Sequence, residues 1–97
     1  MREFLRGAVR LHILHHASAG DIHGSWMAEE LESHGHKISP GTLYPTLHRM
    51  EAEGLLTSNP VVVGGRTRRV YRATRKGRTV LAETRAVLRQ LADEVLE

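Results

Sequence analysis

Apolar residues recur at helical spacing along the first third of the chain and predict two helices. Residues 2–19 carry apolar side chains around much of the helical circumference, so this helix is expected to be mostly buried. Residues 23–34 place Trp26, Met27 and Leu31 on one face and acidic side chains on the other, which is typical of a helix that packs one side against a core. Glycine and small polar residues separate the two segments and predict a short connection.

A third helix is predicted over residues 39–53, where both ends carry a signal. Ser39 followed by Pro40 is a typical helix start, because serine caps free N–H groups and proline fits the first helical position. Gly54 supplies the stop. Pro45 conflicts with a helix interior, since it lacks an N–H and crowds the preceding turn. The apolar positions expected to face inward are Leu43, Leu47 and Met50.

After Gly54 the helical pattern gives way to β-branched residues, which predict a hairpin. The first strand is expected over residues 55–57 and 61–63, and the second returns through residues 70–72 after a turn at residues 64–65. Pro60 cannot donate a sheet hydrogen bond, so we expect it on an edge or in a bulge, with the first strand irregular or interrupted there.

The last segment, residues 75–97, has a heptad pattern of apolar positions at alternating steps of three and four. A helix this long exceeds what so small a domain needs to cover its core, so we expect self-association to use the surplus. The seam positions are Leu81, Thr84, Leu88, Leu91 and Val95.

Three helices, a hairpin and a further helix are the element order of a winged helix-turn-helix. We therefore expect a mainly α fold with a small β-hairpin, a DNA-binding domain over residues 1–74 and a C-terminal dimerisation helix over residues 75–97. The 97-residue chain is one small domain with a marginal core. It contains no cysteine, so disulfides cannot stabilise it, and a second subunit is the expected support.

The absence of cysteine also fits a reducing cytosol and excludes thiolate metal sites and cysteine nucleophiles. No apolar run is long enough to span a membrane, and the N-terminus lacks the pattern of a signal peptide. The sequence therefore predicts a soluble, cytoplasmic protein without a membrane partner.

Basic residues are concentrated in one segment of the chain. The formal net charge is +3, from 14 Lys and Arg against 11 Asp and Glu. Residues 66–78 hold seven of the basic residues and no acid, so the rest of the chain carries −4 (seven minus eleven). Val70 and Tyr71 interrupt the run with apolar groups that can anchor a strand. Contact with nucleic acid is therefore favoured over a disordered, solvated charge run.

Two stretches of the sequence are similar to a known family. Residues 39–55 (Ser-Pro-Gly-Thr-Leu-Tyr-Pro-Thr-Leu-His-Arg-Met-Glu-Ala-Glu-Gly-Leu) closely resemble the recognition-helix signature of the PadR family of transcriptional regulators. Residues 69–78 (Arg-Val-Tyr-Arg-Ala-Thr-Arg-Lys-Gly-Arg) resemble its wing and the entry to its last helix. The likeness covers nearly the whole chain and is to the short branch of the family. It departs at residues 23–26 (His-Gly-Ser-Trp), where the family commonly has a start like His-Gly-Tyr-Glu, so we expect a changed packing or ligand role for this region.

The resemblance implies a homodimeric DNA-binding regulator, often a repressor, whose single C-terminal helix serves as the dimerisation arm. Some members bind small aromatic compounds between subunits, but the last helix here has no aromatic residue, which argues against an aromatic-stacking site. A dimer would set two recognition helices about 34 Å apart, one turn of DNA, and so predicts a pseudo-palindromic operator. An effector, a small molecule or a metal, would change the angle between the two heads.

A recognition helix offers its first turns to base edges in the major groove, and its N-terminus and hydroxyl groups to phosphate. Arginines at a hairpin tip suit the phosphate backbone or the minor groove, where their forked donors bind better than lysine. Tyr44 is equally suited to core packing with its hydroxyl at the surface, and Arg49 to simple solvation. The residues expected to contact DNA are Ser39, Thr42, Tyr44, His48, Arg49, Arg66, Arg68 and Arg69.

Seven histidines form a second chemical feature. His12 and His16 stand four residues apart on one helical face, a spacing that can chelate a divalent metal, and His15 lies between them. These three are the candidate metal ligands, Zn²⁺ would then act as an effector, and no cofactor is required. Other possible ligands follow nearby in the sequence: His23, His34 and His36, with carboxylates at Asp21, Glu29 and Glu30. Without cysteine or a His-Glu-x-x-His pattern, ordinary polar residues are the favoured interpretation of the histidines.

Two other function classes compete with a regulator. One is a histidine-based metal enzyme, but the sequence contains no phosphate loop, no nucleophile elbow and no paired acid and base. We therefore expect the chain not to be an enzyme. A winged helix can also bind proteins instead of DNA, because fold does not fix function. That alternative predicts binding indifferent to charge reversal at Arg68 and Arg69, whereas phosphate binding would lose affinity and salt dependence.

Overall fold

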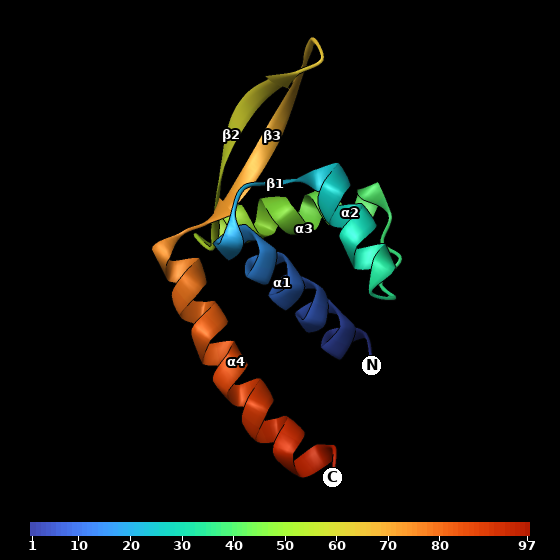
Figure 1. The fold of residues 1–97 in the computed structure, drawn as a ribbon, viewed down its shortest axis with the longest axis vertical. Helices are drawn as coiled ribbons and strands as arrows, with labels where there is room; N and C mark the ends of the chain where they lie inside the picture. The colour runs from blue at the N-terminus through green and yellow to red at the C-terminus, as the bar shows by residue number, and fades with distance from the viewer.

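Four helices and three short strands build an elongated molecule in the computed structural model, which describes residues 1–97 (Figure 1). The hairpin projects from one end, and the last helix runs toward the other. The elements are α1 (Arg2–Ala19), β1 (Ile22–His23), α2 (Gly24–Ser33), α3 (Pro40–Ala52), β2 (Leu56–Val63), β3 (Arg66–Ala73) and α4 (Arg75–Val95). This arrangement confirms the predicted winged helix-turn-helix.

The first two helices form where the periodicity predicts them, but two expectations about their burial are wrong. Helix α1 is not mostly buried, because its core residues all lie in its second half, while Phe4 and Leu5 near its start are 66% and 44% exposed. Met27 and Leu31 of α2 enter the core as expected. Trp26 does not: it is 44% exposed, with its ring against the His16 side chain instead of the core.

Helix α3 confirms the expected start and interior face. Ser39 occupies the N-cap position in extended geometry, but its hydroxyl caps no backbone N–H and instead donates to Thr42 Oγ1 at 3.3 Å. The helix continues through Pro45 without interruption. The inward residues are the predicted Leu43, Leu47 and Met50, joined by Thr46.

The hairpin turns at Gly64 and Gly65, which adopt φ values of 56° and 76°. A two-residue turn with two positive φ angles matches strand twist, and glycine tolerates it without strain. Strand β2 is not interrupted at Pro60, which pairs opposite Arg69 in an unbroken ladder. The expected edge position is confirmed, because the strand order is β1-β3-β2 and β2 has only one neighbour.

The core lies where α1, α2 and α3 meet the base of the hairpin. It comprises Ile13, Leu14, Ala17, Ile22, Met27, Leu31, Leu43, Leu47, Met50, Leu55, Leu56, Tyr71, Ala73 and Leu81. Of the predicted seam of α4, only Leu81 enters this core. Leu88, Leu91 and Val95 remain 45%, 48% and 67% exposed. No helix is both long and apolar enough to cross a membrane.

Candidate nucleic-acid interface

A polar hollow of about 350 Å³ lies between the start of α2, the exposed face of α3 and the hairpin. Tyr44 and His48 reach it from α3, where they stand four residues apart on the face opposite the core. Arginines of β3 form its other wall. The hollow therefore unites five residues that the sequence predicts to contact DNA: Tyr44, His48, Arg66, Arg68 and Arg69.

Tyr44 is held in this hollow by its contact with Gly24 at the start of α2. A Cβ atom at position 24 would lie 2.5 Å from Tyr44 Cε1 and 2.9 Å from its hydroxyl oxygen. The tyrosine ring thus rests directly on the α2 backbone, and 38% of the residue remains exposed. Tyr44 was equally suited to core packing and to a surface position. The structure supports the surface position, with one side of the ring against the α2 backbone.

The base of the hairpin is tied to α3 by a chain of hydrogen bonds. Arg69 Nε donates to Ser58 Oγ at 3.1 Å, and Ser58 Oγ in turn donates to the Glu51 carboxylate at 2.8 Å. Each of these residues belongs to a different element, β3, β2 and α3. The network therefore ties the base of the hairpin to the C-terminal end of α3.

The seven basic residues of the 66–78 segment divide into two groups. Several carry structural contacts: Arg72 pairs with Asp21 at 2.7 Å, Lys76 donates to the Glu53 carbonyl at 2.8 Å and Arg78 to the Ala73 carbonyl at 3.0 Å. By contrast, the guanidinium groups of Arg66 and Arg68 are exposed and make no hydrogen bond or ion pair. These two cations near the hairpin turn are available to a ligand.

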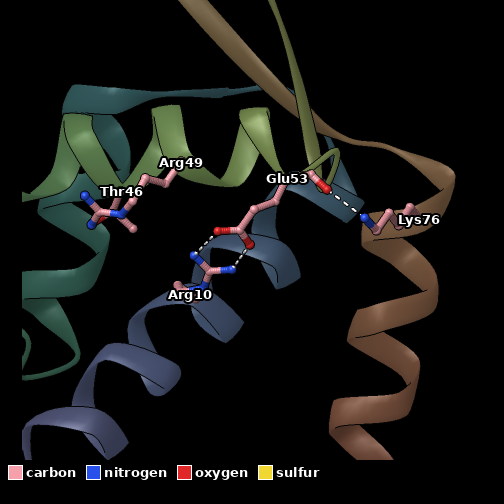
Figure 2. Close-up of polar contacts among 5 residues, drawn as sticks. All are labelled: Arg10, Thr46, Arg49, Glu53 and Lys76. Carbon is pink, nitrogen blue, oxygen red and sulfur yellow. Dashed lines mark hydrogen bonds and ion pairs between the residues drawn. The ribbon is translucent and has the colours of Figure 1, made fainter.

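Two of the three remaining predicted contact residues lie on the opposite flank of α3, and Ser39 stands at the start of the helix, hydrogen-bonded to Thr42. Thr42 and Arg49 line a second hollow together with Arg6 and Arg10 of α1. Arg49 donates to Thr46 Oγ1 at 3.3 Å, and Arg10 forms a two-pronged ion pair with Glu53 (Figure 2). The structure therefore separates Thr42 and Arg49 from the hairpin arginines.

Among the residues of the main hollow that sequence reasoning missed are two polar ones at the start of α2, His23 and Ser25. They enter it because β1 pairs with β3, with His23 opposite Val70. A two-residue strand has no periodicity to detect. The only local signal is the departure from the family pattern at residues 23–26, which predicts a changed packing or ligand role without saying which surface the region joins.

Comparison with known proteins assigns the chain to a family. The model of the transcriptional regulator PadR-like family matches residues 13–83, which include α2, α3 and the whole hairpin. The chain belongs to the PadR-like family. Its members are transcriptional regulators and not enzymes, which confirms that expectation for this chain.

Individual relatives and solved structures cover between 78% and 99% of the chain. The transcriptional regulator Rv3488 of Mycobacterium tuberculosis is 64% identical over 96 residues, 99% of this chain and 90% of that protein. A PadR family regulator from Eggerthella lenta has a TM-score of 0.84 at 34% identity, covering 96% of this chain and 82% of the other. Bacillus subtilis PadR, solved in complex with operator DNA, shares the fold at a TM-score of 0.69 and 21% identity, over 78% and 45% of the two chains.

A second, apolar groove runs along the face of this PadR-like chain between α1 and α4, with a volume of about 640 Å³. Phe4 and Leu11 line it from α1, and Leu88 and Leu91 from α4. Four of the five predicted seam residues therefore border the groove, and only Val95 does not: Leu81, Thr84, Leu88 and Leu91. The apolar start of α1 is thus exposed on the same face as the seam of α4.

The predicted histidines separate at the α1 surface. His12 and His16 face α2, where Glu30 Oε2 lies 2.9 Å from His16 Nε2 and 3.3 Å from His34 Nε2. His15 instead faces α4, and its Nδ1 accepts from Arg85 Nη2 at 2.8 Å. Partial burial lowers the pKa of both His12 and His15, and the charge of His16 lowers each pKa further.

Proposed function

We propose that the chain is a dimeric DNA-binding repressor that reads an operator with α3 and grips its backbone with the hairpin. One observation carries the proposal: Tyr44, His48 and the hairpin arginines converge on a single hollow. A helix face beside unpaired arginines suits DNA, because base edges give specificity while phosphates give most of the affinity. The complex of Bacillus subtilis PadR with operator DNA supports it by likeness of fold.

Roles within the hollow follow from side-chain chemistry. Tyr44 and His48 stand on the face of α3 that can enter the major groove, where each base pair presents a distinct set of donors and acceptors. Arg66 and Arg68 suit phosphate or the adjacent minor groove. His23 and Ser25, at the start of α2, add polar groups beside the same backbone. On the opposite flank, Thr42 and Arg49 remain proposed contacts for a neighbouring phosphate, together with Ser39 at the helix start, which hydrogen-bonds to Thr42.

A DNA titration by fluorescence anisotropy tests the proposal. The protein is titrated into labelled DNA from its own upstream region and into shuffled DNA, at two salt concentrations. We expect preference for the first DNA and a steep loss of affinity with salt. The Arg66→Ala, Arg68→Ala double variant should flatten the salt dependence by roughly two counterions per subunit, because each lost phosphate contact removes about 0.9 from the slope.

Two further variants separate base contacts from general charge. His48→Ala should reduce the preference for operator over shuffled DNA while leaving the salt slope unchanged, because base contacts carry specificity. Arg89→Ala, on α4 away from the hollow, is the matched charge control and should bind as the parent protein does. Binding that ignores the hairpin double variant would contradict the proposal and favour a protein-interaction module.

Dimerisation through the groove between α1 and α4 is the second part of the proposal. Phe4, Leu88 and Leu91 are exposed in the single chain, and burial of apolar area is the main favourable term in association. A second copy offers the same apolar face, as two-fold symmetry requires. The paired subunits would present two α3 helices to half-sites about 34 Å apart, and a small-molecule or metal effector would release DNA by altering their angle.

A further inference from the structure

Two helices each contribute a pair of metal-binding side chains to one small cluster. His12 and His16 are spaced four residues apart on α1, and Glu30 and His34 have the same spacing on α2. Side chains four residues apart share a helical face, so each helix presents its pair as a unit. The pairs face each other, because the ring centroids of His12 and His34 are 4.9 Å apart and His16 Nε2 lies 2.9 Å from Glu30 Oε2. Within the α1 pair, the His12 and His16 ring centroids are 5.1 Å apart.

From this arrangement we propose that His12, Glu30 and His34 bind a divalent transition-metal ion of the zinc type. One ligand atom from each of the three lies within 4.8 Å of the others. Zinc binds such atoms at about 2.0–2.2 Å, which places neighbouring ligand atoms roughly 3–3.5 Å apart. The Glu30 Oε2 to His34 Nε2 distance is already 3.3 Å, so closure around an ion requires the His12 side chain to move inward from its present separation of up to 4.8 Å.

His16 is a positioning residue in this site. Its Nε2 lies 2.9 Å from Glu30 Oε2, and the His16 side chain is only 20% exposed. A ring N–H held against a ligating carboxylate fixes the direction of the carboxylate and is a usual support of metal sites. Three protein ligands leave a fourth position of a tetrahedral ion for water. His15 stays outside the set, because it contacts Arg85 on the α4 side.

The donor chemistry selects the class of ion. Two imidazoles and one carboxylate suit zinc and its neighbours, whereas calcium and magnesium prefer all-oxygen sites. Hydrogen bonding alone explains the cluster less well than a bound metal ion does. Glu30 Oε2 is shared by the imidazoles of His16 and His34, and His12 has no hydrogen-bond partner. A cation at the centre would engage His12 as well as Glu30 and His34.

Metal binding at this site would join α1 to α2, and α2 reaches the proposed DNA surface. The first residue of α2, Gly24, carries the Tyr44 ring, and His23 and Ser25 line the same hollow. An ion that moves α2 relative to α1 would therefore change the position of Tyr44. This regulatory step rests on the proposed function, whereas metal binding itself does not.

The metal site is tested on the untagged full chain without DNA. Zn²⁺ is titrated by calorimetry, and Co²⁺ by its visible absorption and by quenching of Trp26, the single tryptophan, whose ring lies 5.0 Å from that of His16. We expect one ion per chain, a tetrahedral Co²⁺ spectrum that Zn²⁺ abolishes, and quenching of Trp26 fluorescence.

Variants assign the ligands. His12→Ala and His34→Ala should each weaken Zn²⁺ binding by about 100-fold or more, and His16→Ala by about 10-fold to 100-fold, the usual effect of losing a supporting contact. His36→Ala is the matched control, since His36 follows the same helix without joining the cluster, and should bind Zn²⁺ as the parent does. Circular dichroism of each apo variant checks that it is folded.

Absence of Zn²⁺ binding by the folded parent would overturn the site, as would binding that His12→Ala and His34→Ala leave unchanged. The regulatory step is measured separately, by the DNA titration with and without Zn²⁺. Bound Zn²⁺ that leaves DNA affinity unchanged in the parent would overturn regulation alone. Failure of all DNA binding would refute the proposed function and leave the metal titration to stand on its own result.

Discussion

Gly77 lies where α4 meets the turn between α3 and β2, and its replacement by alanine tests how tightly that joint is built. A Cβ atom at position 77 would lie 2.1 Å from the Leu55 carbonyl oxygen, 3.1 Å from the Leu55 carbonyl carbon and 3.3 Å from Leu14 Cδ2. Cβ atoms essentially never come within 3.0 Å of a heavy atom outside their own and the adjacent residues. The helix must therefore move away from the turn by about 0.9 Å, the difference between 3.0 and 2.1 Å.

That movement opposes the helical preference of alanine. Alanine favours a helix over glycine by about 1 kcal/mol at most, but overpacking costs about 1–3 kcal/mol. The shift also stretches the bond from Thr74 N to the Leu55 carbonyl oxygen, now 3.1 Å, and such a bond contributes about 0.5–1.5 kcal/mol. We expect Gly77→Ala to lower the free energy of unfolding by about 1–3 kcal/mol, which in a domain this small lowers Tm by roughly 5–20 °C.

Thermal and urea unfolding, followed by circular dichroism at one fixed protein concentration, measure this loss. The fixed concentration matters because dimerisation would make Tm concentration-dependent. Ala82→Gly, at an exposed position of the same helix, is the control, and its loss of about 1 kcal/mol reports helix propensity without a backbone clash. A Gly77→Ala protein as stable as the parent, or more stable, would refute the steric reasoning.

Three other substitutions test separate contacts. Glu53→Gln removes the ion pair with Arg10, whose hydrogen bond holds the pKa of the carboxyl below its usual range. The ion pair contributes at most about 1 kcal/mol, because it is so exposed. This stabilisation is present at neutral pH and is lost as pH falls through the lowered pKa of Glu53. If urea titrations show the Glu53→Gln protein to be less stable than the parent by the same amount at pH 7 and at pH 3, the reasoning is contradicted. Thr74→Ala should cost about 1–2 kcal/mol in urea unfolding, because its hydroxyl caps the start of α4, and Thr74→Ser should retain most of that stability. Leu88→Glu should leave the subunit folded but give a monomer in light scattering. The control Gln90→Glu should remain a dimer. A dimeric Leu88→Glu protein would exclude that surface as the interface.

The sequence predicted most of the elements, because their signals are local. Ser39-Pro40 marked the start of α3, and Gly64-Gly65 marked a turn that requires two positive φ angles. What the sequence did not predict depends on contacts between distant elements. Strand β1 has only two residues and forms because β3 lies beside it. For the same reason Pro60 did not break its strand, since the ladder on either side kept the register.

In the candidate sites, too, local spacing could be predicted from the sequence, whereas contacts between distant elements could not. Spacing on one helix predicted that His12 and His16 act together, and the crossing of α1 and α2 decided that Glu30 and His34 join them while His15 does not. For Tyr44, sequence left core and surface equally open. The contact with Gly24, twenty residues away in the chain, decided between them.

The hairpin also raises a question of solubility. Strand β2 leaves one edge open, and residues 61–63 are three consecutive valines, a composition prone to pairing with strands of other chains. Pro60 offers no N–H to such a partner, and the arginines at positions 66 and 68 on the neighbouring strand would repel a second hairpin. The positive charge that suits DNA thus also opposes aggregation. Variants in which several hairpin arginines are replaced by neutral residues should precipitate more readily than the parent protein.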